Sequence, residues 1–154
     1  MRKLGDIHAR FNHLTLVVGD AQVVPGWAGM EAHGFPDDEV ELDGGSVFVF
    51  DLNLLRTVVF RSDDGLRLVA SFDGLGSTNV DEATLLAAAA EDGNPEERGT
   101  FDVTSGAMIL SCADCVSPGA NGVSTMVIPC ENGPYVVSGS TRIGDLVHTR
   151  IRLV

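Results

Sequence analysis

The chain reads Val40-Glu41-Leu42-Asp43-Gly44-Gly45-Ser46-Val47-Phe48-Val49-Phe50-Asp51-Leu52 in its first third. Two short apolar runs flank Asp43-Gly44-Gly45, and an Asp-Gly pair between β-prone runs is a strong signal for a β-hairpin. In the second run apolar residues follow one another almost without interruption, which is typical of strands that are covered on both faces. This stretch therefore predicts a hairpin of buried strands.

Short apolar runs between turn residues continue along most of the chain. Leu55 to Arg61 and Leu66 to Phe72 flank a second predicted turn, Ser62-Asp63-Asp64-Gly65. Leu146 to Val154 alternates apolar and polar residues, which is the clearest strand period in the sequence. Further strands are expected over residues 13–18, 99–103, 107–112, 124–128 and 135–138.

One segment favours a helix. Ala83 to Ala90 is an Ala/Leu run of high helix propensity, Asn79 with Glu82 fits an N-terminal cap, and Gly93 suits the stop. We expect one short helix over residues 80–91. Together with about eight or nine strands, this predicts a mainly β protein, a β-sandwich that forms a single domain over residues 1–154.

Composition limits the class of protein. A chain of 154 residues with 44 % apolar residues is large enough to bury a core. It contains no long apolar run and no apolar stretch after Met1-Arg2-Lys3, so neither a membrane span nor a secretory signal is predicted. Three cysteines are too few for a disulfide framework, which favours a cytoplasmic protein.

The acidic residues are segregated. The net charge is −12, and residues 11–55 and 68–97 contain no Lys or Arg. Such a surface favours a cationic partner and argues against nucleic acid or an anionic membrane. Aromatic residues beside the acids are candidate anchors, and Tyr135 is a further one. The predicted partner-binding residues are Phe35, Asp37, Asp38, Glu39, Glu41, Asp43, Trp27, Asp92, Glu96 and Glu97. The alternative is that these acids only keep the protein soluble.

The C-terminal half has a recognisable order of predicted elements: two strands joined by a turn, then a strand that ends in a proline, then a strand that begins with Gly-Pro-Tyr. It reads Phe101-Asp102-Val103-Thr104-Ser105-Gly106-Ala107-Met108-Ile109-Leu110-Ser111, then Met126-Val127-Ile128-Pro129, then Asn132-Gly133-Pro134-Tyr135-Val136-Val137. With Phe11-Asn12-His13-Leu14-Thr15-Leu16-Val17 and Ala32-His33-Gly34-Phe35, this pattern resembles the competence protein J family, small bacterial β-sandwich proteins regarded as inhibitors of a DNA-entry nuclease. The resemblance covers most of the chain except the helical region.

The resemblance implies a nuclease inhibitor or an immunity protein that guards against a toxin. Combined with the acidic segments, it predicts a protein that binds a cognate basic toxin, a nuclease, and occludes its active-site cleft with carboxylates. On this prediction the protein is not an enzyme and needs no cofactor.

Two alternatives come from other classes. One is a small zinc protein or enzyme, because Cys112 and Cys115 are spaced to chelate one Zn²⁺ with Cys130 and His148 as further ligands. The preferred interpretation is that these are ordinary buried or loop cysteines and that no metal is bound, because a lone C-x-x-C pair is a weak signal. A redox pair is disfavoured as well, since neighbouring acids raise thiol pKa values. The other alternative is a ligand-binding or assembly module.

The remaining charged residues suggest structural roles. None of the four histidines has a Ser or Cys nucleophile in matching local context, so surface or structural histidine is expected. Arg142, Arg150 and Arg152 are interpreted as the solvent face of an edge strand.

Overall fold

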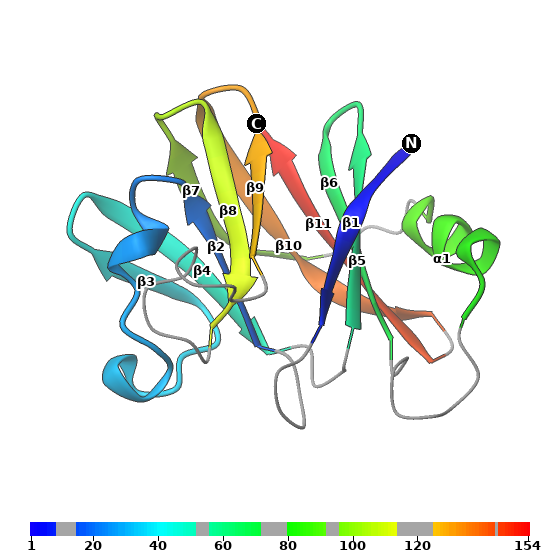
Figure 1. Cartoon of the computed structure of the whole chain (residues 1–154), viewed down its shortest axis with the longest axis horizontal. Coiled ribbons are helices and arrows are strands. Elements are labelled where there is room, and N and C mark those ends of the chain that lie inside the picture. The colour runs from blue at the N-terminus through cyan, green and yellow to red at the C-terminus, as the bar shows by residue number, and fades with distance from the viewer. Residues whose placement is uncertain (9–14, 52–55, 72–79, 92–95, 114–124, 144) are drawn as a thin grey trace.

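The computed structural model of the chain describes residues 1–8, 15–51, 56–71, 80–91, 96–113, 125–143 and 145–154. Within these residues eleven strands form two antiparallel sheets that pack face to face, with one short helix beside them (Figure 1). The predicted mainly β sandwich with a helix near residues 80–91 is confirmed, and the strand number is slightly higher than predicted.

Six strands form the larger sheet. In spatial order they are β1 (Arg2–His8), β5 (Arg56–Ser62), β6 (Gly65–Ser71), β11 (Leu146–Leu153), β10 (Gly133–Ile143) and β7 (Glu97–Val103). Five strands form the smaller sheet, in the order β3 (Glu39–Leu42), β4 (Gly45–Asp51), β2 (Thr15–Asp20), β8 (Ala107–Cys112) and β9 (Thr125–Pro129).

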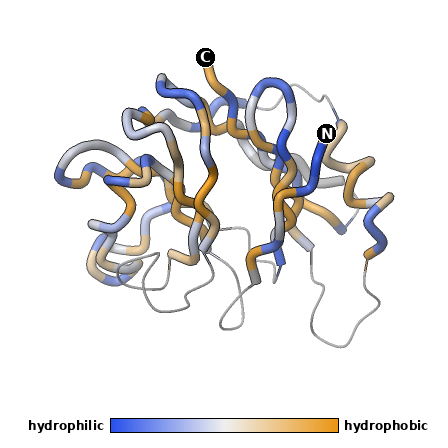
Figure 2. Tube along the Cα trace, turned by 45° about the horizontal axis from the view of Figure 1, so that its top comes forward, coloured by the Kyte–Doolittle hydropathy of each residue, from blue (hydrophilic) through white to orange (hydrophobic). Residues whose placement is uncertain are grey.

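Both predicted hairpins are present. Val40 pairs with Val47 across the first turn, and Arg61 pairs with Leu66 across the second. Hydrophobic residues lie along the inner parts of the strands, whereas the turns are hydrophilic (Figure 2).

The apolar residues form three clusters, which explains why so many strands are apolar on both faces. The central cluster lies between the sheets and includes Leu16, Phe50 and Val59. A second cluster covers the outer face of the smaller sheet around Trp27, and a third lies under the helix around Phe60. Burying both faces of a strand favours continuous apolar runs over strict alternation.

The helix α1 (Glu82–Ala89) covers the outer face of the larger sheet. Leu85, Ala88 and Ala89 are its buried residues. Asp81 is its N-cap and accepts a hydrogen bond from the backbone N–H of Thr84 at 2.7 Å. The cap is therefore not the predicted Asn79, which lies outside the described residues. No helix among the described residues has the length and apolar character needed to span a bilayer.

Two predictions about the sheet are wrong. Strand β1 has no counterpart among the predicted strands, because Arg2, Lys3, Gly5 and Asp6 give it little β character. Strand β11 is not an edge strand but lies between β6 and β10. The helix α1 contacts β11, and the side chain of His148 on that strand is buried.

Candidate functional site

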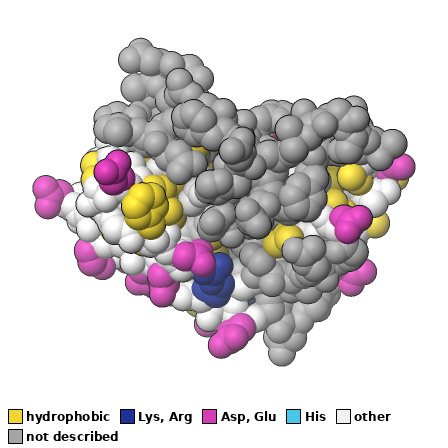
Figure 3. Space-filling model, turned by 90° about the horizontal axis from the view of Figure 1, so that it is seen from below, with side chains coloured by type: hydrophobic (Ala, Val, Ile, Leu, Met, Phe, Trp, Pro, Cys, Tyr) yellow, Lys and Arg dark blue, Asp and Glu magenta, His cyan; other side chains and the backbone are white. Residues whose placement is uncertain are grey.

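One edge of the sandwich gathers most of the predicted partner-binding residues. We call it the acidic surface and define it by Phe35, Asp37, Asp38, Glu39, Glu41, Asp43, Glu96 and Glu97, all of which are exposed. Seen from below, acidic side chains surround a hydrophobic patch on the side of the molecule that holds β3 and β4 (Figure 3). The sequence predicted each of these residues, but not that they meet.

The acidic surface has Phe35 at one end. Its side chain is 71 % exposed, and its backbone φ of 53° is the only positive value at a non-glycine residue described here. The turn is held by the hydrogen bond from the Phe35 N–H to the Met30 carbonyl oxygen (2.9 Å). A large apolar ring held outward on a strained backbone is unusual, and such strain is concentrated at functional positions.

Two of the acids also tie the sheets together. The Glu39 carboxylate accepts a hydrogen bond from the Thr100 N–H of β7 at 2.6 Å. Arg98 pairs with the Asp37 carboxylate at 3.0 Å, and its guanidinium lies 5.3 Å from the centroid of the Phe48 ring. These contacts bring β7, and with it Glu96 and Glu97, next to the segment of residues 37–43. Two acidic segments about 60 residues apart in sequence therefore share one surface.

Two other acidic residues form only exposed contacts within the protein. Glu41 accepts a hydrogen bond from the Ser46 hydroxyl (2.6 Å), and Glu97 contacts Arg152 at 3.5 Å in an exposed ion pair. Exposed pairs of this kind contribute little to stability, so such carboxylates remain available to a stronger cation. The predicted residue Asp92 lies outside the described residues.

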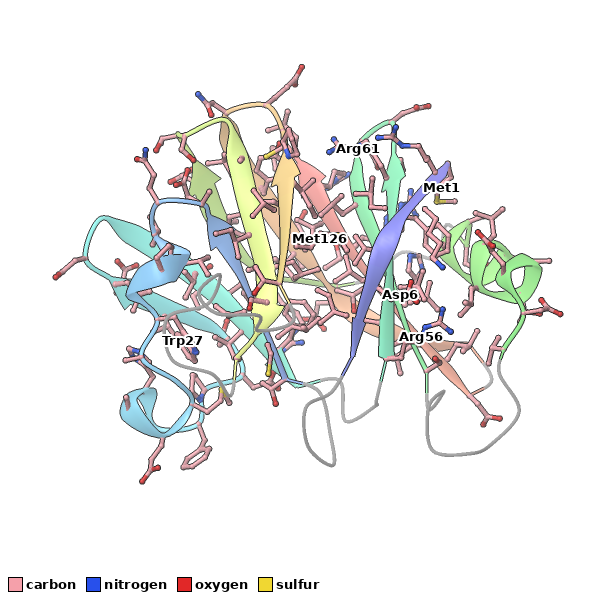
Figure 4. The ribbon with its side chains drawn as sticks, viewed as in Figure 1. Met1, Asp6, Trp27, Arg56, Arg61 and Met126 are labelled. Atoms are coloured by element: carbon pink, nitrogen blue, oxygen red, sulfur yellow. The ribbon has the colours of Figure 1, made fainter. Side chains whose placement is uncertain are left out.

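The structure does not support Trp27 as a surface anchor. Its side chain is 1 % exposed, its indole N–H donates to the Ala113 carbonyl oxygen at 2.7 Å, and its ring stacks on His33 with 4.3 Å between centroids. Trp27 therefore joins the segment after β2 to the smaller sheet (Figure 4). Tyr135 is also buried; its hydroxyl donates to the Glu131 carbonyl oxygen at 2.8 Å.

The proposed zinc ligands are not brought together. Cys112 is at one end of β8, whereas Cys130 follows Pro129, which pairs with Ala107 at the other end. His148 lies on the outer face of the larger sheet, away from both. Cys115 lies outside the described residues, and within them no three His, Cys, Asp or Glu side chains form a metal-binding group. Burial raises the pKa of the Cys130 thiol, which lowers its reactivity as a thiolate.

A cleft of about 420 Å³ opens at the end of the sandwich near Cys130. Its walls are the turn between β5 and β6 and the segment between β9 and β10, with Met108, Leu66 and Tyr135 as apolar lining. Polar groups of Arg61, Asp64 and Glu131 reach its rim. This cleft could not be predicted from the sequence, because its lining residues come from four separate segments.

Asp20 is a structural carboxylate that the sequence did not single out. It is buried, and its oxygens accept hydrogen bonds from the backbone N–H groups of Gln22 (2.7 Å), Thr104 (2.6 Å) and Ser105 (2.9 Å). Burial acts to raise the pKa of Asp20, but these hydrogen bonds outweigh it and hold the pKa below its ordinary value.

A comparison of the chain with protein-family models, curated proteins and solved structures found no match. The resemblance to the competence protein J family therefore stays a prediction.

Proposed function

We propose that the protein is an inhibitor of the immunity type that binds a cationic bacterial toxin, a nuclease, through the acidic surface. The observation that carries this proposal is the convergence of Phe35, the segment of residues 37–43 and the start of β7 on one edge of the sandwich. An exposed aromatic side chain bordered by carboxylates combines an apolar anchor with charges that select a basic partner.

The mechanism is occlusion. A nuclease holds its substrate phosphates in a cationic cleft, and carboxylates on a rigid strand occupy such a cleft in place of phosphates. The ties from Glu39 and Asp37 to β7 fix the backbone of this edge, so less conformational entropy is lost on binding. Phe35 then enters an apolar part of the target surface, and exclusion of water around the ring strengthens the nearby ion pairs.

The electrostatic field of the protein increases the rate of association with a basic partner. With a net charge of −12, the chain attracts a basic protein from a distance and raises the association rate. Salt reduces this attraction because the Debye length falls to roughly 8 Å at physiological ionic strength.

The proposal is tested by capture of partners from the native host, with the product of the adjacent gene included. Tagged wild-type protein is compared with the double variant Asp38→Lys/Glu41→Lys and with the control Glu82→Lys/Glu91→Lys. Both variants change the net charge equally, but the control residues lie at α1, at the opposite end of the molecule from β3 (Figure 1).

We expect the wild type and the control variant to capture one basic protein, and Asp38→Lys/Glu41→Lys to fail to capture it. That protein, once purified, must lose its activity when the wild type is added. Equal capture by both variants, or a captured protein whose activity is unaffected, would contradict the proposal.

A further inference from the structure

A groove of about 400 Å³ lies between the two edge strands at the opposite side of the sandwich from the acidic surface. Strand β1 is the outer strand of the larger sheet there, and β9 is the outer strand of the smaller one. The groove is lined by Arg2, Leu4, Arg61, Met126, Ile128 and Pro129, with the exposed Val127 at its border.

Side chains close this side of the sandwich. A Cβ atom on Gly5 would lie 2.9 Å from the Met126 methyl carbon, so the glycine provides the space that the Met126 side chain occupies. Arg61 donates to the Pro129 carbonyl oxygen at 2.6 Å. In Figure 4 Met126 lies between β9 and β1, with Arg61 above it. A flexible methionine and one arginine form a closure that a ligand can displace without breaking a strand ladder.

The charge of the groove differs from that of the rest of the chain. Its lining contains two arginines and no carboxylate. Among the described residues, Lys3, Arg56, Arg67, Arg98, Arg150 and Arg152 each form an ion pair with an Asp or Glu. Arg2 and Arg61 form no ion pair with any Asp or Glu that the structure describes. In a protein of net charge −12, these two arginines lie beside one apolar groove, and guanidinium groups are well suited to bind carboxylates.

The width of the groove selects the kind of ligand. An added β-strand needs roughly 9.6 Å between its two neighbours, twice the usual strand spacing. Cα atoms of β1 and β9 approach within 8 Å of each other, which leaves no room for a strand without separating the sheets. The groove therefore suits a ligand narrower than a strand, and its apolar lining includes Leu4, Met126 and Ile128.

We infer that this groove binds a small amphipathic carboxylate, with the carboxylate on Arg61 and Arg2 and the apolar chain along Leu4, Met126 and Ile128. The anion replaces the Pro129 carbonyl oxygen as the acceptor for Arg61, and a planar guanidinium suits a carboxylate better than a single carbonyl. The groove is separate from the acidic surface, so a test of carboxylate binding in the groove does not depend on the proposed inhibitor function.

The test uses sodium octanoate as the probe and ¹³C-methyl methionine NMR as the readout. Met126 reports on the groove, and Met30, in the apolar cluster around Trp27, serves as an internal reference. We expect a saturating shift of the Met126 signal with octanoate, no shift of Met30, and no saturating shift with octylamine, which has the same chain and the opposite charge.

Variants locate the anion. Arg61→Gln is expected to weaken octanoate binding by about tenfold or more, the loss of one charge-assisted contact. Arg2→Gln, at an exposed terminal position, serves as a second variant if the first does not fold, and is expected to weaken binding as well. The control Arg152→Gln removes the same charge from the outer face of the larger sheet and should bind as the wild type does.

Three results would overturn the inference: no saturating change at Met126, equal binding of octylamine and octanoate, or unchanged affinity in folded Arg61→Gln and Arg2→Gln proteins.

Discussion

Phe35 combines an exposed ring with a backbone conformation that other residues avoid. Its two features can be separated by a pair of variants. Phe35→Ala removes the ring and keeps the strain, whereas Phe35→Gly removes both. Glycine occupies positive φ without steric cost, so we expect Phe35→Gly to have a free energy of unfolding about 1 kcal/mol higher than Phe35→Ala.

Both Phe35 variants should lose affinity for the partner, because the ring is the proposed anchor. Urea unfolding and partner binding are the two measurements. A Phe35→Gly protein less stable than Phe35→Ala would refute the strained turn, and partner binding unchanged in both would remove Phe35 from the acidic surface.

Asp20 should control part of the stability in acid. Asp20→Asn replaces one accepting oxygen by an NH₂ group that faces backbone donors, so we expect a loss of about 1–3 kcal/mol in the free energy of unfolding at neutral pH. The folded pKa of Asp20 is lowered relative to the unfolded chain. Its contribution is therefore complete above the unfolded pKa of roughly 4 and is lost as pH falls through the folded pKa.

Unfolding measured between pH 7 and pH 2 checks this prediction. The gap in stability between wild type and Asp20→Asn should narrow below about pH 4. A gap that stays constant with pH would show that Asp20 acts through packing and not through its charge.

Individual residues were only partly predictable from sequence. Acidic side chains are exposed by default, so the exposure of Asp38 or Glu41 follows from residue type. The expectation of exposure is wrong for Asp20, which is buried. Residue type also does not predict whether Trp27 is buried, because aromatic residues occur both in cores and at interfaces. Which of these applies depends on neighbours distant in sequence, such as Ala113 and Thr104.

At the scale of elements, the turn between β5 and β6 depends on Gly65. A Cβ atom there would lie 2.1 Å from the Ile151 carbonyl oxygen of β11, and the φ of Gly65 is +146°. Since the obstacle is backbone, Gly65→Ala should lower the free energy of unfolding by about 3 kcal/mol or more.

Gly106 provides the matched control for Gly65. It also has a positive φ, +80°, but a Cβ atom there meets no other atom within 4 Å. Gly106→Ala should therefore cost only about 1 kcal/mol for the backbone conformation. Thermal and chemical unfolding measure the stability of both variants. Similar decreases in the free energy of unfolding would disprove the close approach of Gly65 to β11.

Most elements could be predicted because their local signals agree with their environment. The hairpins at residues 39–51 and 56–71 have both turn residues and apolar runs, and Ala107–Cys112 was predicted with its observed bounds. Strand β1 could not be predicted, because it is defined by its pairing with β5 and not by its composition. The helix was predictable from propensity, whereas its predicted cap, Asn79, lies two residues before the observed cap, Asp81.

On the scale of the whole molecule, the two open sides of the sandwich differ in chemistry. At the β3–β7 side, carboxylates bind the neighbouring strand and continue into an exposed acidic surface. At the β1–β9 side, arginines and apolar side chains line a groove. The order of strands that creates these two sides rests on pairings far apart in sequence, and no local pattern encodes it.

The charge distribution was the strongest functional signal in the sequence. It identified the acidic segments but not the contacts of Arg98 and Thr100 that place them together. Those contacts give the acidic segments a defined position on one surface, as the proposed inhibitor function requires.

The central claim is that this surface steers and binds a cationic protein. The most direct measurement is the association rate constant with the captured basic partner, determined by stopped flow between low and high salt. We expect a fast wild-type rate constant that falls steeply with salt. At low salt, Asp38→Lys/Glu41→Lys should reduce the rate constant at least about tenfold, whereas Glu82→Lys/Glu91→Lys should reduce it only by the smaller effect of the changed net charge. A rate that does not depend on salt, or equal rates for the two charge-reversed variants, would contradict it.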